Sequence, residues 1–290
     1  MKANMEAQEL SYKINSIFCS IRAGKVTEKE KYVPDHALIY ILSGKLNIVE
    51  ADSQSIFKQG DTVFVRRNTL AKFTKYPDNN GQPFRSLSIF FKKSFLKDYL
   101  VRNNLETGLG DSTCNPVKIK KVASTPLMKT LFDSLYLYFD SGLVLGRELS
   151  EIKTREAIML LAQIDYSLYQ SLFNLTEPGK IDLEKFMCKN FMFNVPLETF
   201  AKMTGRSLST FKRDFEKIFN KPPSRWLKKK RLEFAHYLIK EKHKTPSDVY
   251  LEVGFENLSH FSSSFKEVYG YNPSSLYDDP YNKVSLASWQ

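Results

Sequence analysis

The chain has 290 residues, of which 42% are hydrophobic and 26% are charged, and its formal net charge is +11. This length suits two domains with separate cores, and the excess of lysine and arginine suits a polyanionic partner such as nucleic acid. Cys19, Cys114 and Cys188 are widely spaced and form no paired ligand motif, which argues against a disulfide framework and against a zinc site.

The N-terminus has no basic start followed by an apolar run, so the sequence predicts no secretory leader. No stretch of the chain approaches the roughly 20 apolar residues that cross a bilayer. We therefore expect a cytoplasmic protein without membrane contact.

Residues 1–124 show the pattern of short β-strands. A dense apolar run from Leu38 to Leu42 is followed by a turn at Ser43–Lys45, and apolar and polar residues then alternate through Val49. Gly60 and Asp61 form another turn before a further strand. Short strands separated by Gly-Asp turns at a spacing of ~10 residues predict a small barrel or sandwich.

Two arginines and one histidine are the candidate functional groups of this β region. Arg66 and Arg67 could bind an acidic effector or a partner protein. Strand alternation offers a simpler interpretation, which we favour, in which one arginine enters an ion pair and the other faces solvent. His36 stands alone in this region, so we expect no metal site and no cofactor.

Residues 125–174 predict two amphipathic helices with a break near Gly142. Their expected apolar stripes share three- and four-residue spacing and comprise Leu127, Leu131, Leu135, Tyr138 and Phe139, then Ile152, Ala157, Leu160, Leu161 and Ile164. This pattern fits a homodimer contact and fits packing on the barrel. Residues 175–180 contain Pro178 and Gly179 and predict a linker.

Residues 181–278 contain the same pattern twice, about fifty positions apart. Each copy predicts a short helix, a glycine that permits a positive φ, an N-cap, and a longer helix with two buried aromatic residues. The glycines are Gly205 and Gly254, and the caps are Ser207 and Asn257. The expected apolar positions of the longer helices are Phe211, Phe215 and Ile218 in the first copy, and Phe261 and Phe265 in the second.

A long helix from Pro223 to Lys240 is expected between the two copies and would span roughly 25 Å. Adding the flanking helices places the two longer helices of the copies about 34 Å apart, one turn of B-form DNA. The outward residues are short, polar or basic, as base edges and phosphates require. The predicted DNA contacts are Arg206, Ser209, Thr210, Lys212, Arg213, Asn257, Ser259, His260, Ser262, Ser263 and Lys266.

This repeated segment resembles the DNA-binding domain of the AraC/XylS family of bacterial transcription regulators. The matching residues include Gly205, Ser207, Phe211, Arg213 and Phe215, then Arg231, Leu232 and Ala235, and finally Gly254, Phe255, Ser259, Phe261, Phe265, Gly270 and Pro273. The β region more weakly resembles the cupin-type sensor barrel that precedes this domain in the family. The resemblance implies promoter DNA and RNA polymerase as partners, an effector-binding barrel, and activation of transcription.

Two positions depart from the family pattern. Ser263 occupies a place where the family usually has an arginine, so the second copy lacks its best guanine and phosphate donor. Pro246 and Ser247 replace a frequent Ser-Ile pair, and we expect them to cap the following helix. The first copy, with Lys212 and Arg213, is therefore expected to carry more of the sequence selectivity.

The sequence thus predicts an α+β protein with a cupin-like barrel and flanking helices, followed by an all-α domain with two helix-turn-helix motifs. The expected boundaries are 1–124 for the barrel, 125–174 for the helical segment, 175–180 for the linker, 181–278 for the DNA-binding domain and 279–290 for a tail. No nucleophile, base or metal cluster indicates an enzyme. The alternative is a ligand- or protein-binding module with a weakly specific nucleic-acid tether.

Overall fold

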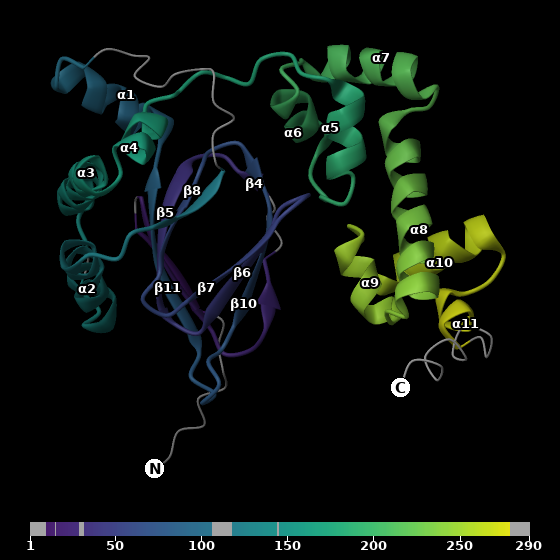
Figure 1. The fold of residues 1–290 in the computed structure, drawn as a ribbon, viewed down its shortest axis with the longest axis horizontal. Helices are drawn as coiled ribbons and strands as arrows, with labels where there is room; N and C mark the ends of the chain where they lie inside the picture. Colours follow the sequence, from purple (N-terminus) through teal and green to yellow (C-terminus); the bar gives the residue numbers. More distant parts are fainter. Residues whose placement is uncertain (1–9, 15, 29–31, 106–117, 144, 279–290) are drawn as a thin grey trace. The chain divides into compact units, whose positions relative to one another are not determined.

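The computed structural model describes residues 10–14, 16–28, 32–105, 118–143 and 145–278. The chain divides into two compact units, residues 1–177 and 178–290 (Figure 1). The division falls inside the segment 175–180 that we expected to be a linker. Among the described residues, no helix is both long and apolar enough to cross a bilayer.

Within its described residues, the first unit contains two facing antiparallel sheets and a short two-stranded pair (Figure 1). In spatial order, the six-stranded sheet consists of β1 (Leu10–Ile14), β2 (Ile17–Arg22), β11 (Phe84–Phe91), β5 (His36–Ser43), β8 (Thr62–Val65) and β12 (Ile119–Val122). The four-stranded sheet consists of β3 (Val26–Thr27), β10 (Lys72–Tyr76), β6 (Lys45–Val49) and β7 (Gln54–Lys58). The pair consists of β4 (Tyr32–Val33) and β9 (Thr69–Leu70).

The six-stranded sheet is apolar on both faces. Successive side chains of a strand point to opposite sides of the sheet, so a run of apolar residues contributes to both faces. On β5, Ala37 and Ile41 join the core between the two sheets, whereas Leu38 and Tyr40 join the core on the other face. The expected α+β fold is confirmed. The expected barrel takes the form of two separate sheets packed face to face.

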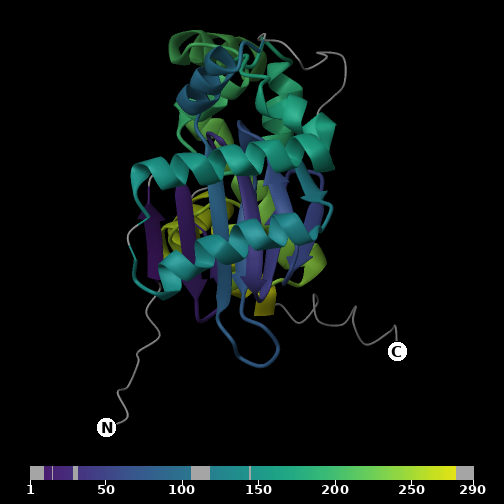
Figure 2. The ribbon, with the colours of Figure 1, turned by 90° about the vertical axis from the view of Figure 1, so that its left-hand side faces the viewer.

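The described part of this unit has four helices, and two of them lie across the outer face of the large sheet (Figure 2). They are α1 (Lys93–Arg102), α2 (Pro126–Asp140), α3 (Arg147–Ile164) and α4 (Tyr166–Leu172). Phe132 of α2 stacks on Tyr40 of β5 with ring centroids 5.0 Å apart. Helix α1 was not predicted, although Phe95, Leu96, Tyr99 and Leu100 recur at helical spacing and pack in or against the core.

Two residues of the expected helical stripes face solvent. Leu127 and Ile152 are 58% and 59% exposed, whereas the buried positions beside them are Met128 on α2 and the polar Ser150 and Thr154 on α3. The prediction was wrong there because α2 has apolar residues at adjacent positions and α3 buries small polar residues. Apolar spacing alone selects the buried set in neither case.

The second unit contains seven helices within its described residues. They are α5 (Leu183–Asn190), α6 (Leu197–Met203), α7 (Leu208–Phe219), α8 (Pro223–Lys242), α9 (Pro246–Glu252), α10 (Leu258–Tyr269) and α11 (Pro273–Asp278). The repeated pattern therefore forms two helix-turn-helix motifs, α6–α7 and α9–α10, joined by α8. Helix α5, which follows the cap residue Asp182, was not predicted from the sequence.

Two local expectations in this unit are corrected. Ile218 is 43% exposed, so the buried aromatics of α7 are Phe211 and Phe215 without it. The cap of α9 is Thr245, whose hydroxyl accepts from the amide of Asp248 at 3.2 Å, and Pro246 occupies the first helical position. Proline is suited to that position because its missing N–H would have no partner there.

Candidate nucleic-acid interface

We call α6, its turn and α7 the first reader, and α9, its turn and α10 the second reader. In the first reader Gly205 has φ +65°, a left-handed conformation that disfavours any side chain. Ser207 caps α7 by accepting from the amide of Thr210 at 3.2 Å. Phe211 and Phe215 are fully buried, which fixes the rotation of α7 about its axis.

This rotation leaves three of the predicted contact residues exposed on α7, namely Ser209, Lys212 and Arg213, and Thr210 half-buried. The side chain of Arg213 is 66% exposed, and its Nε lies 3.7 Å from Oδ1 of Asp214. A pair at this distance and exposure holds the guanidinium weakly. Arg213 is therefore available to a nucleic acid.

Arg206 is placed differently from these residues. Its side chain is only 7% exposed. It donates to Oδ2 of Asp214 at 3.1 Å, to the carbonyl of Ile181 at 3.0 Å and to that of Thr204 at 2.8 Å. The hydrogen bond from Arg206 lowers the pKa of Asp214, with Lys180 and Arg213 adding to the shift. Arg206 thus ties α7 to the segment that precedes α5.

The second reader has the same backbone plan. Gly254 has φ +95°, and Asn257 caps α10 by accepting from the amides of Ser259 and His260. Phe261 and Phe265 are fully buried, and Ser264 beside them is 3% exposed.

The outer face of α10 carries less charge than that of α7. Its exposed candidates are Ser259, His260, Ser263 and Lys266, and Ser262 is half-buried. The hydroxyl of Ser263 donates to the carbonyl of His260 at 3.1 Å. Lys266 is therefore the one residue of the predicted contact set on α10 with a fixed positive charge.

Arg231 on α8 has a structural position. Its guanidinium donates to the carbonyls of Phe191 at 2.8 Å and Phe193 at 2.9 Å, and to those of Gly254 and the Asn194 side chain at 3.3 Å each. Burial lowers its pKa to about 10. Arg231 is therefore held largely by backbone carbonyls, and the structural ion pair that the sequence suggested for it is replaced by these hydrogen bonds.

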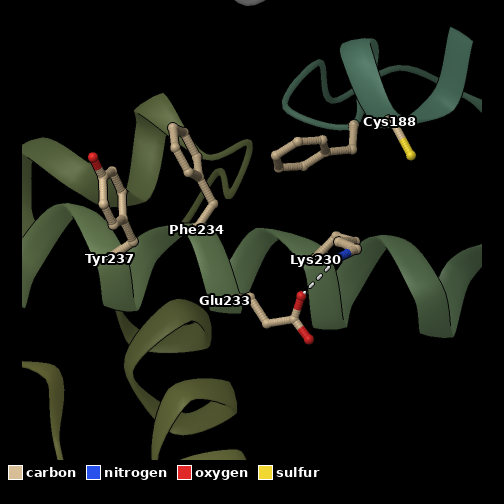
Figure 3. Close-up of a pocket in the computed structure, with 6 residues that line it drawn as sticks. Cys188, Lys230, Glu233, Phe234 and Tyr237 are labelled. Carbon is tan, nitrogen blue, oxygen red and sulfur yellow. Dashed lines mark hydrogen bonds and ion pairs between the residues drawn. The ribbon is translucent and has the colours of Figure 1, made fainter. Parts of the chain in front are cut away.

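The basic run on α8 is engaged with nearby carboxylates. Lys228 pairs with Glu267 of α10 at 2.7 Å, and Lys230 pairs with Glu233 at 3.0 Å. A cavity of about 320 Å³ lies between α5 and α8, lined by Cys188, Phe191, Lys230, Glu233, Phe234 and Tyr237 (Figure 3). None of these residues belongs to either recognition helix.

Comparisons with known proteins agree with this geometry. The model of a helix-turn-helix domain matches residues 200–278, and the model described as the ExsA N-terminal regulatory domain matches residues 36–169. The chain belongs to the AraC/XylS family. One model describes a helix-turn-helix domain and the other a regulatory domain. This AraC/XylS-family member is therefore a DNA-binding transcription regulator with an N-terminal regulatory domain, and not an enzyme.

Three relatives illustrate the match. The HTH-type transcriptional regulator ExsA of Pseudomonas aeruginosa is 26% identical over 255 residues, which are 83% of this chain and 85% of ExsA. The thermoregulatory protein LcrF of Yersinia pestis is 26% identical, covering 82% of this chain and 87% of LcrF. A virulence regulon transcriptional activator VirF of Yersinia enterocolitica is 24% identical, with the same coverage as LcrF. The solved structure of ToxT from Vibrio cholerae aligns with a TM-score of 0.38 and 14% identity, covering 90% of this chain and 96% of ToxT.

The regulatory unit of this AraC/XylS-family protein contains a cavity of about 660 Å³ between its two sheets. Most of its lining is apolar and includes Phe18, Ile39, Phe73 and Phe90. Three charged residues also line it, namely Arg22, Glu28 and Lys75. The Oε1 atom of Glu28 lies 2.5 Å from Nζ of Lys75 and 3.3 Å from a terminal nitrogen of Arg22.

These charged residues were missed at the sequence level, and Arg66 and Arg67 were named in their place. Neither Arg66 nor Arg67 lines the cavity. Arg67 is 7% exposed and pairs with Glu177 at 3.1 Å, in agreement with the ion-pair interpretation that we favoured. The signal for Arg22 lay in the alternation of Phe18, Ser20 and Arg22 along one face of β2.

His36 supports the backbone beside these arginines. It is fully buried, stacks on Phe64 with ring centroids 5.5 Å apart, and its Nδ1 accepts from the amide of Arg67 at 3.2 Å. Burial, with Arg66 and Arg67 nearby, lowers its pKa to about 3. The ring is therefore neutral at physiological pH and holds the chain that leaves β8.

Proposed function

We propose that the two readers bind successive major grooves of promoter DNA, and that the first reader supplies most of the sequence selectivity. The exposed Lys212 and Arg213 on α7, held by the buried Phe211 and Phe215, support this proposal. An arginine on a recognition helix can donate both of its terminal groups to a guanine. The second reader adds affinity through Lys266 and its short polar residues.

We infer further that the protein is a cytoplasmic activator that contacts RNA polymerase. The relatives ExsA, LcrF and VirF are named as regulators, and VirF as an activator, which supports this sign of regulation.

Selection of genomic DNA fragments by the purified full chain at physiological salt tests the proposal. The expected result is a motif with two major-groove segments one turn apart. A matched pair of variants then assigns the first reader. Arg213→Ala should relax the base preference of one half of the motif, and Lys185→Ala on α5, which removes the same charge, should not. Loss of preference in both variants would contradict the assignment.

The second candidate function, a binding module with a weakly specific tether, draws on the weakly charged face of α10. It requires nearly equal affinity for selected and random DNA, whereas specific binders typically favour their sites by about 10³ or more. A competition experiment with both DNAs at one salt concentration decides between the two functions.

We propose that a small-molecule effector occupies the cavity between the two sheets. Its volume of about 660 Å³ lies in the usual range for such sites. The apolar lining suits a largely apolar compound, and Arg22 and Lys75 outnumber Glu28, which favours an anionic group on the ligand. Thermal unfolding of the full chain with matched anionic and neutral apolar compounds tests this, and Lys75→Met should remove the preference for the anion.

We propose a homodimer through α2 and α3. Each helix leaves two large apolar side chains exposed, Leu127 and Leu137 on α2 and Ile152 and Met159 on α3, all between 58% and 65% exposed. Light scattering during size exclusion measures the assembly. Met159→Glu should shift it toward the monomer, whereas Arg155→Glu on the same helix should shift it less.

A further inference from the structure

The segment that connects the two units is held from both sides. Residues 175–177 are held by Arg67 and Lys93 of the first unit, and residues 179–181 contact the first reader. Each set of contacts lies within one unit. Pro178 is the single residue between the two anchors.

The upstream anchor combines Arg67 and Lys93. Arg67 donates to the carbonyl of Leu175 at 3.1 Å, to that of Thr176 at 3.4 Å and to Oε1 of Glu177 at 3.1 Å. Lys93, the first residue of α1, donates to the same Oε1 at 2.5 Å. One carboxylate therefore joins the loop after β8, the start of α1 and the connecting segment.

This carboxylate is strongly held for a residue at the surface. Its side chain is 49% exposed, whereas that of Arg67 is 6% exposed. The hydrogen bond from Lys93, followed by that from Arg67, lowers the pKa of Glu177 to about 2. Glu177 thus remains charged and paired throughout the physiological pH range.

The downstream anchor is the turn of the first reader. The backbone of Gly179 and Lys180 lies so close to Gly205 that no Cβ fits there. Arg206 donates to the carbonyl of Ile181 at 3.0 Å, and Nζ of Lys180 lies 3.6 Å from Oδ2 of Asp214 on α7. The start of the second unit is therefore built into the motif that we propose to read DNA.

We propose that the Glu177 carboxylate, when paired with Arg67 and Lys93, holds the connecting segment on the first, regulatory unit. We call these contacts the latch, and we call the part of residues 175–178 that they leave unattached the joint. The latch thus sets the length of the joint between the regulatory unit and the first reader. With the latch closed, the joint is Pro178, whose ring fixes φ and removes the amide hydrogen. When Arg67 and Lys93 release Glu177 together with the carbonyls of Leu175 and Thr176, residues 175–177 can join Pro178 in the joint. Three additional residues extend the reach of the joint by roughly 10 Å. This inference deepens the proposed function, because it names how the regulatory unit restrains the first reader.

The latch is adjacent to the effector cavity along the chain. Val65, the last residue of β8, lines the cavity, and Arg67 follows two residues later. The amide of Arg67 is held by the buried His36, at the start of β5, and the next residue of β5, Ala37, lines the cavity too. A ligand that displaces the end of β8 would therefore displace the guanidinium that holds Glu177.

Limited trypsin digestion of the full chain tests the latch. The enzyme must draw out the residues on both sides of Lys180 before it can cut after it, so the rate of this cut reports how often the segment is released. Glu177→Ala and Lys93→Met should each accelerate it about two- to fivefold, as expected for a partly exposed pair. Glu184→Ala on α5, a matched loss of carboxylate, should leave the rate unchanged.

The double variant Glu177→Ala with Lys93→Met supplies the decisive comparison, because residues in one network give non-additive effects. A rate no higher than that of the Glu177→Ala variant supports the latch. Equal cutting rates in the wild type and the Glu177→Ala variant would overturn it. The digestion contains no DNA, so the latch stands or falls on the cutting rates, whereas failure of the wild-type chain to select any DNA would overturn the proposed function.

Discussion

The two readers have nearly the same interior and different surfaces. Both bury two phenylalanines completely, Phe211 and Phe215 in the first and Phe261 and Phe265 in the second. The first reader then presents Lys212 and Arg213, where the second presents Ser262 and Ser263.

A second difference lies beneath these surfaces. The first reader contains the Arg206–Asp214 ion pair, and the corresponding positions of the second are the buried Phe255 and Ser264. A repeated motif can therefore keep one core while its copies carry different surfaces, which is the basis of our proposal that the first reader selects bases and the second adds affinity.

The largest effect on stability should come from the buried phenylalanines that each reader contains. Phe211→Ala and Phe261→Ala each empty a fully buried site and should lower the free energy of unfolding by about 3–5 kcal/mol. Urea unfolding of the full chain followed by circular dichroism measures both. In a Trp289→Phe background, Trp226, which lies 5.5 Å from the ring of Phe215, reports the first reader by fluorescence. A loss of less than about 1 kcal/mol in one variant would show that the two cores are not equivalent.

Substitutions on the exposed faces of α7 and α10 should change DNA binding in different ways. Arg213→Ala should weaken binding to the selected DNA by about 1–3 kcal/mol and relax base preference at its half of the site. Lys266→Ala, which removes the same charge from α10, should weaken binding to all sequences alike. Fluorescence anisotropy with the selected site and with single-base variants measures both. The reverse ranking would assign selectivity to the second reader.

Restoring an arginine to the second reader should reduce the asymmetry. Ser263→Arg should tighten binding, and the slope of log K against log salt should steepen by about one unit if the new charge meets a phosphate. The salt titration is best run beside Glu184→Arg on α5, which adds charge away from α10. A gain in both variants would indicate a general charge effect rather than a contact made by α10.

The smallest expected effect is a loss of stability of the first reader at low pH. The pKa of Asp214 is lower in the folded protein than its ordinary value of 3.8, chiefly because Arg206 donates to it. The ion pair therefore stabilises the first reader above that ordinary value, and this contribution is lost as pH falls below it. Fluorescence of Trp226 in the Trp289→Phe background should show acid weakening of the first reader. Asp214→Asn should make this part of the pH dependence disappear, and an unchanged profile would contradict the assignment.

Local patterns predicted the readers well because their determinants lie within a few residues. Ser207 and Asn257 cap α7 and α10 as expected, and Asn220 and Gly270 end these helices in left-handed conformations. A cap and a 3.6-residue period are properties of one short segment.

Contacts between segments that are distant in sequence could not be predicted from such local patterns. Arg206 resembles a DNA contact in sequence, yet one of its acceptors is the carbonyl of Ile181, 25 residues earlier. Arg22 and Lys75 meet at Glu28 only because β2 and β10 belong to facing sheets. Nothing in the spacing of these residues indicates a shared cavity.

The contacts of Arg231 bear on the spacing of half-sites in the promoters that this protein would bind. Its guanidinium binds the loop between α5 and α6 at Phe191 and Phe193, and the turn of the second reader at Gly254. The turn of the second reader is thereby tied to the loop that leads into the first reader. An inserted base pair would move one half-site by about 3.4 Å and about 35° around the duplex. Among the promoters of this regulator, we therefore expect the base sequence between the two half-sites to vary while its length in base pairs stays constant.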